Sequence, residues 1–455
     1  MLNQGQGWIC NLAPFCRRNT PLLLPGLFAG ILAVCAWWIS CERANPDLWL
    51  QLLAAEGISE GRGYGFEEQG RWISIADRPP ITRWPPGVSV LAATITMLGG
   101  DPLIFLTHLY PILLGASYLI LFAALRKYVS LGTAAIGAFY ALSFHSVIQS
   151  HRVLQSEPLA LFLSLLLAKT CAESDSRLWA VLRIVMIGII LTMVRSAGAF
   201  IVTGALAGYV LGNYSTWAKR FVVLTVLVGF TLLPIILFQS GDSSKVNPVS
   251  LFKEMIGNTF PAVELIGPHF YPDGRLLPIR AVIAEVLVIV ISLITLRKTK
   301  SSLGVVSLLI FIAYVCMLAY SSSRYEYSWW RLYRVTGFVL PFLAIAFTLI
   351  LPKGRLWLAL LLLISVGHLA QTLLAAEKQP GYREVHDTIE KESKRLGVDK
   401  LCVNSDSREI LRLLWYSRRY YKELGVDIQY ENCESQELSV KDRGLMRNGK
   451  ILAQF

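Results

Sequence analysis

Long runs of apolar residues, separated by short polar segments, fill most of the chain between residues 21 and 375. Many of these runs reach the roughly 20 residues that a helix needs to cross a bilayer. The pattern predicts eleven spans, over residues 22–40, 102–125, 131–149, 158–172, 178–195, 197–213, 221–239, 281–296, 302–320, 335–351 and 356–375. A further apolar run, 87–99, is too short to cross comfortably, so we expect a re-entrant or interfacial helix there.

The composition agrees with a multi-pass membrane protein. Apolar and aromatic residues make up 54% of the chain and charged residues only 16%, and the mean hydropathy is +0.51. A soluble chain would carry about 25% charged residues. The net charge of +12 does not indicate nucleic acid, because the basic excess lies in the membrane part, much of it in short loops.

Those basic loops predict the orientation of the chain. Lysine and arginine in short loops favour the cytoplasmic side. The loops are Arg17-Arg18, Arg126-Lys127, Lys219-Arg220, Arg297-Lys298-Lys300 and Lys353-Arg355. With all of them inside, the larger outer regions are 41–101, 240–280 and the segment from residue 376. The alternative, with 87–99 as a true span, would put most basic loops outside, which the charge bias opposes.

The C-terminal segment 376–455 differs in composition and is nearly balanced in charge. Its pattern predicts helices over 385–396 and 408–424 and strands over 400–404, 426–430 and 450–454. We expect a small extracytoplasmic α/β domain that follows a transmembrane domain over 1–375. The eight cysteines form no CxxC pair, which disfavours zinc ribbons and thioredoxin-like chemistry; a disulfide between Cys402 and Cys433 stays open.

The first outer loop, 41–101, carries the most informative polar pattern. Asp47 follows a proline at a predicted helix start, Gly61-x-Gly63-Tyr64 comes next, and Trp84-Pro85-Pro86-Gly87 opens the short apolar helix. An aspartate at a helix start is also an ordinary N-cap, so Asp47 alone does not establish a catalytic group.

Three further segments place polar residues at predicted helix ends. Glu157-Pro158 opens a span; the pair suits a helix start, but a glutamate at a membrane boundary also indicates function. Arg195 lies at the break between two spans, and Arg331 and Arg334 precede a late span.

Together these segments resemble the GT-C superfamily, in particular the group of protein O-mannosyltransferases and the lipid A aminoarabinose transferase (glycosyltransferase family 39-like). The resemblance runs loosely over residues 20–350 and does not cover the C-terminal segment. Trp84 and Val88-Ser89-Val90 depart from the family's usual tyrosine and additional proline. The resemblance implies an all-α GT-C membrane domain with outer interfacial helices. It also implies an inverting glycosyltransferase of the cell envelope, in the inner (plasma) membrane with an extracytoplasmic active site.

The implied reaction moves a sugar from a polyprenyl-phosphate donor to a lipid, glycan or protein acceptor among membrane lipids. Asp47 is the expected base and Glu157 the second acid across the cavity. Guanidinium groups suit the phosphate leaving group, and the expected phosphate-binding residues are Arg331, Arg334, Arg83, Arg152 and Arg195. For each of these arginines, anchoring at the membrane interface is the alternative interpretation. The expected substrate- or lipid-lining residues are Trp49, Tyr64, Trp84, His151 and Tyr325. No cofactor is required by the sequence, and a loosely bound divalent cation stays open.

The main rival interpretation is a secondary transporter or lipid flippase. Such a protein would carry acids deep within its spans and symmetric halves. Glu285 is the one plausible mid-span acid, and the sequence shows no internal repeat. A purely structural membrane protein, with the C-terminal segment as a binding module, leaves Asp47 and the 61–87 pattern unexplained.

Overall fold

The computed structural model describes most of the helical part and the regular elements of the C-terminal segment. The described residues are 23–40, 46–68, 71–75, 85–151, 154–174, 178–214, 216–239, 294, 301–324, 337, 339–350, 354–374, 382–396, 400–404, 427–430, 438–441, 444–447 and 450–454.

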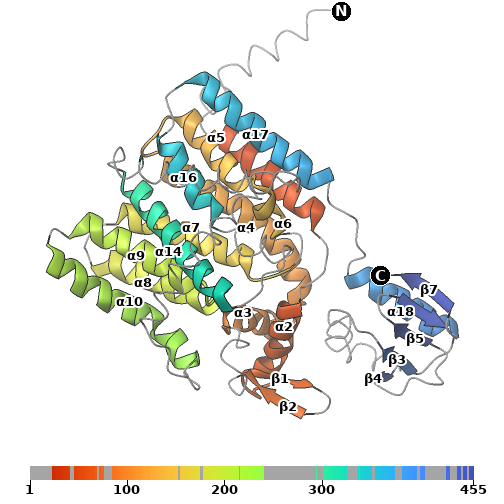
Figure 1. Cartoon of the computed structure of the whole chain (residues 1–455). Coiled ribbons are helices and arrows are strands. Elements are labelled where there is room, and N and C mark those ends of the chain that lie inside the picture. The colour runs from red at the N-terminus through yellow and green to blue at the C-terminus, as the bar shows by residue number, and fades with distance from the viewer. Residues whose placement is uncertain are drawn as a thin grey trace, which may run out of the picture.

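Helices dominate the described part up to residue 374 (Figure 1). They are an N-terminal helix Leu23–Ile39, α2 Pro46–Ser59, α3 Gly87–Met97, α4 Pro102–Leu125, α5 Leu131–Leu142, α6 His145–Gln149, α7 Glu157–Glu173, α8 Leu178–Val194, α9 Gly198–Asn213, α10 Trp217–Gln239, α14 Ser302–Arg324, α16 Leu340–Ile350 and α17 Arg355–Leu374. The predicted short helix at 87–99 is confirmed by α3, and the predicted break at Arg195 is confirmed between α8 and α9. The predicted span 281–296 lies almost wholly outside the described residues.

One predicted span, 131–149, is wrong as a single helix. The structure ends α5 at Leu142 and starts the short α6 at His145. The Ser143 hydroxyl donates to the Tyr140 carbonyl at 3.1 Å, and Phe144 is extended with ψ of 136°. A local side-chain bond of this kind competes with the helical ladder, so the chain turns within an otherwise apolar run.

The outer faces of these helices are apolar. Within the described residues, α4 and α17 are long and apolar enough to cross a membrane, and several shorter apolar helices accompany them. Large side chains stand exposed on their outer faces, including Trp38 (69%), Ile112 (63%) and Leu363 (69%). Contiguous exposed apolar surface is unfavourable in water, so these faces suit contact with lipid tails.

Helices α9 and α14 pack against each other through glycine. A β-carbon added at Gly204 would lie 2.5 Å from the Leu309 carbonyl oxygen, and one at Gly208 would lie 2.6 Å from a methyl group of Val306. Small residues of this kind let two helix backbones approach closely, which is the usual basis of helix association in membranes.

Gly204→Ala is therefore expected to lower the melting temperature in detergent, because the new methyl group meets backbone atoms that cannot rotate away. Gly212, in the same helix, has nothing within 4 Å of an added β-carbon. Gly212→Ala is the control and is expected to be neutral or stabilising, by up to about 1 kcal/mol from helix propensity. Equal melting temperatures for the two variants would contradict the close packing of α9 on α14.

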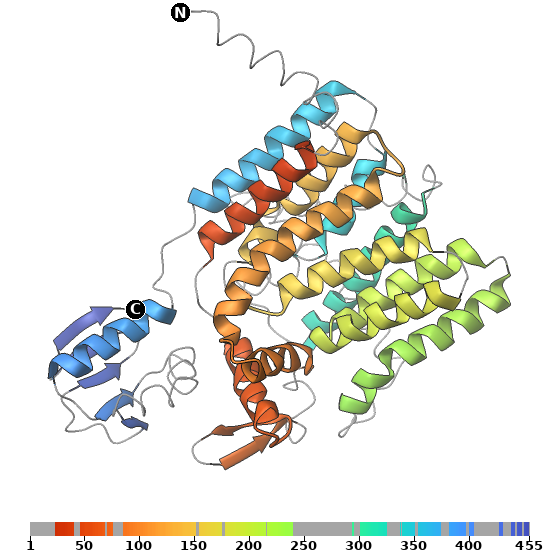
Figure 2. The ribbon, with the colours of Figure 1, turned by 180° about the vertical axis from the view of Figure 1, so that it is seen from behind.

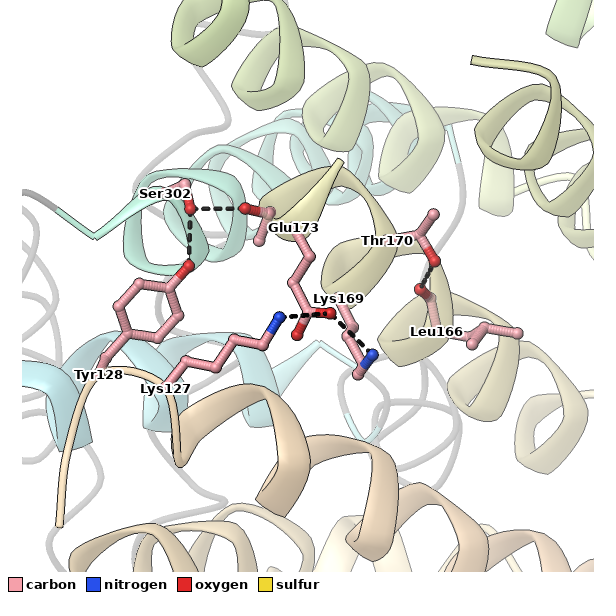
Figure 3. Close-up of polar contacts among 8 residues, drawn as sticks. Lys127, Tyr128, Leu166, Lys169, Thr170, Glu173 and Ser302 are labelled. Carbon is pink, nitrogen blue, oxygen red and sulfur yellow. Dashed lines mark hydrogen bonds and ion pairs between the residues drawn. The ribbon is translucent and has the colours of Figure 1, made fainter. Parts of the chain in front are cut away.

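A polar cluster holds the end of α7 that lies away from Glu157 (Figure 3). Lys127 and Lys169 both contact one Glu173 carboxylate oxygen, at 3.0 and 2.9 Å. Tyr128 hydrogen-bonds Ser302 at 2.7 Å, and the Ser302 hydroxyl lies 2.7 Å from the Ala172 carbonyl oxygen, which it can engage as donor. These bonds join the segment after α4, the end of α7 and the start of α14, and thereby fix the helix that carries Glu157 at its other end.

The C-terminal segment contains helix α18 (Tyr382–Leu396) and a five-stranded sheet of order β4-β3-β5-β6-β7. The strands are β3 Lys400–Asn404, β4 Asp427–Tyr430, β5 Leu438–Lys441, β6 Gly444–Arg447 and β7 Lys450–Gln454. Strand β3 pairs in parallel with β4 and β5, whereas β6 pairs antiparallel with β5 and β7. The first predicted helix and the three predicted strands are confirmed, β5 and β6 were not predicted, and the predicted helix 408–424 and Cys433 lie outside the described residues.

Candidate active site

The segment predicted as the first outer loop contains α2, a hairpin and α3, which gather at one end of the helical bundle (Figures 1 and 2). Strand β1 (Gly65–Glu68) pairs antiparallel with β2 (Arg71–Ser74). Gly61 and Gly63 have positive φ values of 73° and 92°, a conformation that favours glycine. The glycine pair therefore provides the turn by which the chain leaves α2 and enters the hairpin.

The hairpin packs directly on α2. An added β-carbon at Gly57 would lie 2.4 Å from the Trp72 ring, and the Arg62 guanidinium stacks over that ring at 4.7 Å. Tyr64 packs against the small apolar core that α2 shares with the hairpin. Burial raises the pKa of the Tyr64 phenol, and the nearby Ser89 side chain of α3 acts in the opposite direction. Helix α2, the hairpin and the start of α3 thus pack together within the described residues.

Helix α3 begins against the end of α8. A β-carbon at Gly87 would lie 2.6 Å from the Met193 carbonyl oxygen and 2.9 Å from the Val194 nitrogen. Only glycine permits this approach without displacing the backbone. The Pro86-Gly87 segment therefore packs against the backbone directly before Arg195, although the two segments are far apart in sequence.

Arg195 forms an ion pair with Glu157. The guanidinium Nη1 lies 2.8 Å from Glu157 Oε1 and donates to the Ser156 hydroxyl at 3.2 Å. The Glu157 side chain is fully buried, and that of Arg195 is 17% exposed. A buried carboxylate needs such a partner, so the two predicted site residues form one unit that joins the start of α7 to the α8–α9 turn.

Tyr110 of α4 is a further candidate residue that the sequence analysis missed. It is fully buried, and the charge of the Glu157 carboxylate acts on its phenol. The sequence does carry a signal for this residue, because Tyr110 directly precedes Pro111 inside an apolar run. A polar group and a residue that disturbs helix geometry therefore stand side by side within one predicted span.

His151 lies in the turn between α6 and α7 and is 1% exposed. Burial lowers its pKa to about 4, while the contact of Nδ1 with the Val147 carbonyl oxygen, at 2.8 Å, acts in the opposite direction. The imidazole is therefore neutral at pH 7, and Nδ1 carries the proton that it donates. In the same turn the Gln155 amide donates to the Ser150 carbonyl at 2.7 Å, which orders the approach to Glu157.

The remaining predicted residues are placed only in part. Asp47 is the second residue of α2, and its side chain lies outside what the structure describes. Trp49 is 1% exposed and packs in the main hydrophobic core; a lining role for it stays a prediction. Six predicted residues lie outside the described part of the chain: Arg83, Trp84, Arg152, Tyr325, Arg331 and Arg334. Within the described residues, no three His, Cys, Asp or Glu side chains gather as a metal site would require.

The bundle shares its fold with the solved structure of ArnT, a member of the group that the sequence resembles, and this confirms the predicted resemblance at the level of fold alone. The structure is similar to that of ArnT from Cupriavidus metallidurans bound to undecaprenyl phosphate. The TM-score is 0.51 at 11% identity, over 90% of this chain and 86% of ArnT.

Two archaeal structures show a weaker likeness. The Archaeoglobus fulgidus oligosaccharyltransferase in complex with zinc and sulfate gives a TM-score of 0.42 at 12% identity, over 88% of this chain and 62% of that one. The oligosaccharyltransferase AglB from the same organism, in complex with an inhibitory peptide and a dolichol-phosphate, gives 0.38 at 13%, over 92% and 57%. By sequence, the chain matches no family model and no curated protein.

Proposed function

We propose that this protein is a membrane glycosyltransferase that moves a sugar from a polyprenyl-phosphate donor to a lipid, glycan or protein acceptor. The observation that carries the proposal is the buried Glu157–Arg195 pair, next to the point where the start of α3 packs on the end of α8. This pair concentrates charge where the helices end, which is costly in a membrane protein unless it serves a function. The fold shared with ArnT supports the same function.

In the proposed reaction, Asp47 accepts the proton of the acceptor group as that group attacks the anomeric carbon. The carbon–oxygen bond to the phosphate breaks, and the polyprenyl phosphate leaves with the bonding electrons. A single displacement of this kind inverts the anomeric configuration. Asp47 suits the role because it stands in the first turn of α2, near the start of the segment predicted as the first outer loop.

Glu157 and Arg195 have a different part in this proposal. Because Glu157 is fully buried and paired with Arg195, it is a positioning residue that holds the guanidinium in place. Arg195 then faces the phosphate of the donor, where a guanidinium stabilises the charge that develops on the leaving group. Arg83, Arg152, Arg331 and Arg334 are the further phosphate ligands of the proposal.

The proposal places the protein in the inner (plasma) membrane with the site and the C-terminal domain on the extracytoplasmic side. The cluster around Glu173 supports this orientation, since Lys127 and Lys169 stand at the end of the bundle that basic residues mark as cytoplasmic. In this proposal the reaction requires no cofactor, and a loosely bound divalent cation at the phosphate is compatible with it.

The test is transfer of radiolabelled sugar in proteoliposomes from a panel of undecaprenyl-phosphate sugars, with cell-envelope lipids and glycans as acceptors. Labelled product and released undecaprenyl phosphate are expected with at least one donor, and none with heat-inactivated protein. Absence of transfer from every donor, together with protein-dependent lipid flipping or solute uptake, would replace the enzyme with a transporter.

A further inference from the structure

Two buried tyrosines in α4 have different surroundings. Tyr118 is 0% exposed, and its hydroxyl donates to the Ala135 carbonyl of α5 at 3.2 Å. Tyr110, two turns earlier, is equally buried, and its hydroxyl has no hydrogen-bond partner among the described residues. Burying a hydroxyl group without a hydrogen-bond partner destabilises the folded protein, so the presence of tyrosine rather than phenylalanine at this position needs a reason.

The surroundings of Tyr110 define what partner would suit it. Helices α4 and α7 pack against each other, the charge of the Glu157 carboxylate acts on the phenol, and Arg195 forms an ion pair with that carboxylate. A neutral hydroxyl can accept a hydrogen bond from the phenol and donate one to a carboxylate oxygen, so it would engage both groups. The position therefore suits a neutral, hydroxyl-bearing group.

We propose that the Tyr110 hydroxyl hydrogen-bonds a hydroxyl group of the sugar carried by the bound donor. The inference rests on the proposed function and deepens it, because it assigns sugar recognition to a residue of α4 rather than to the outer loop. Tyr110 is a binding residue in this account, and Glu157 sets the polarity of the place that the sugar hydroxyl occupies. A polar side chain left unpaired when the hydroxyl is missing gives strong discrimination against deoxy sugars.

The experiment compares Tyr110→Phe with Tyr118→Phe, each of which removes one hydroxyl from the same helix. Thermal melting is measured for the free protein, with undecaprenyl phosphate, and with the undecaprenyl-phosphate sugar that stabilises the wild type most. The extra stabilisation given by the sugar over the bare lipid phosphate is the readout, and the apparent Kd of each lipid is obtained from titrations.

Without ligand, Tyr110→Phe is expected to melt at or above the wild-type temperature. It is expected to bind undecaprenyl phosphate as the wild type does, but to bind the sugar-bearing lipid about ten- to a hundredfold more weakly. Tyr118→Phe is expected to melt lower, because the Ala135 carbonyl loses its donor, and to keep the full sugar increment. In the wild type, deoxy analogues of the sugar should lose the same increment.

Two results would overturn the inference in distinguishable ways. In the first, Tyr110→Phe keeps the full extra stabilisation by the sugar-bearing lipid, whether its melting temperature without ligand is unchanged or falls as far as that of Tyr118→Phe. Tyr110 would then be a structural residue, and the proposed function would stand. Failure of the wild type to bind either lipid would overturn the proposed function and this inference with it.

Discussion

Asparagine in place of Asp47 is expected to lower the rate of sugar transfer by about a hundred- to ten-thousandfold and to leave the melting temperature unchanged. Asparagine keeps the size and the hydrogen-bond acceptor of aspartate but cannot take a proton, so the loss measures general-base catalysis. The comparison also tests the simplest alternative, in which Asp47, at the second position of α2, only interacts with the positive end of that helix. A structural role of that kind predicts no effect on transfer.

Asp101 provides the matched control, because its structural role is capping. It stands before α4, and its carboxylate accepts from the backbone nitrogens of Leu103 and Ile104 at 2.8 and 3.3 Å. Asp101→Asn should therefore keep both stability and transfer, whereas Asp101→Ala should cost about 1 kcal/mol of stability with transfer retained. Full transfer by Asp47→Asn would remove Asp47 from the mechanism and direct the search to another acid.

The sequence predicted the local elements of this protein better than the contacts between them. Apolar run length located α3 and most long helices, and Glu157-Pro158 marked the start of α7 because charge, proline and apolar pattern agree there. The end of α5 at Ser143 was not predicted, because the length of an apolar run does not depend on one side-chain hydrogen bond. The hairpin β1–β2 was missed because each strand is four residues long and the sequences GFEE and RWIS do not alternate clearly.

The site itself depended on tertiary packing. Glu157 and Arg195 were each selected from sequence, but nothing in their spacing predicts that they form an ion pair between the start of α7 and the α8–α9 turn. The approach of Gly87 to Met193 depends in the same way on how α3 packs against α8. Tyr110 gained significance only when α4 and α7 were seen to pack together, because a tyrosine in an apolar span is otherwise an ordinary core residue.

Removal of Arg195 is expected to have the largest effect on stability. In Arg195→Met the Glu157 carboxylate stays buried without its guanidinium partner, and the loss of an ion from such a pair costs about 3–5 kcal/mol. The double variant Glu157→Gln/Arg195→Met removes both charges and is expected to recover most of that loss. Lys394→Met breaks an exposed pair with Glu390 in α18, where the lysine is 66% exposed, and should change stability by less than about 1 kcal/mol.

Transfer activity separates the two functions of the pair. If Arg195 stabilises the leaving phosphate, the double variant should regain its melting temperature and remain as inactive as Arg195→Met, because restored packing does not restore a guanidinium. Recovery of transfer together with stability would mean that the pair serves only to hold α7 against the α8–α9 turn. A double variant as unstable as Arg195→Met would show no energetic coupling between the two residues. The instability of Arg195→Met would then not come from the loss of the guanidinium partner of Glu157.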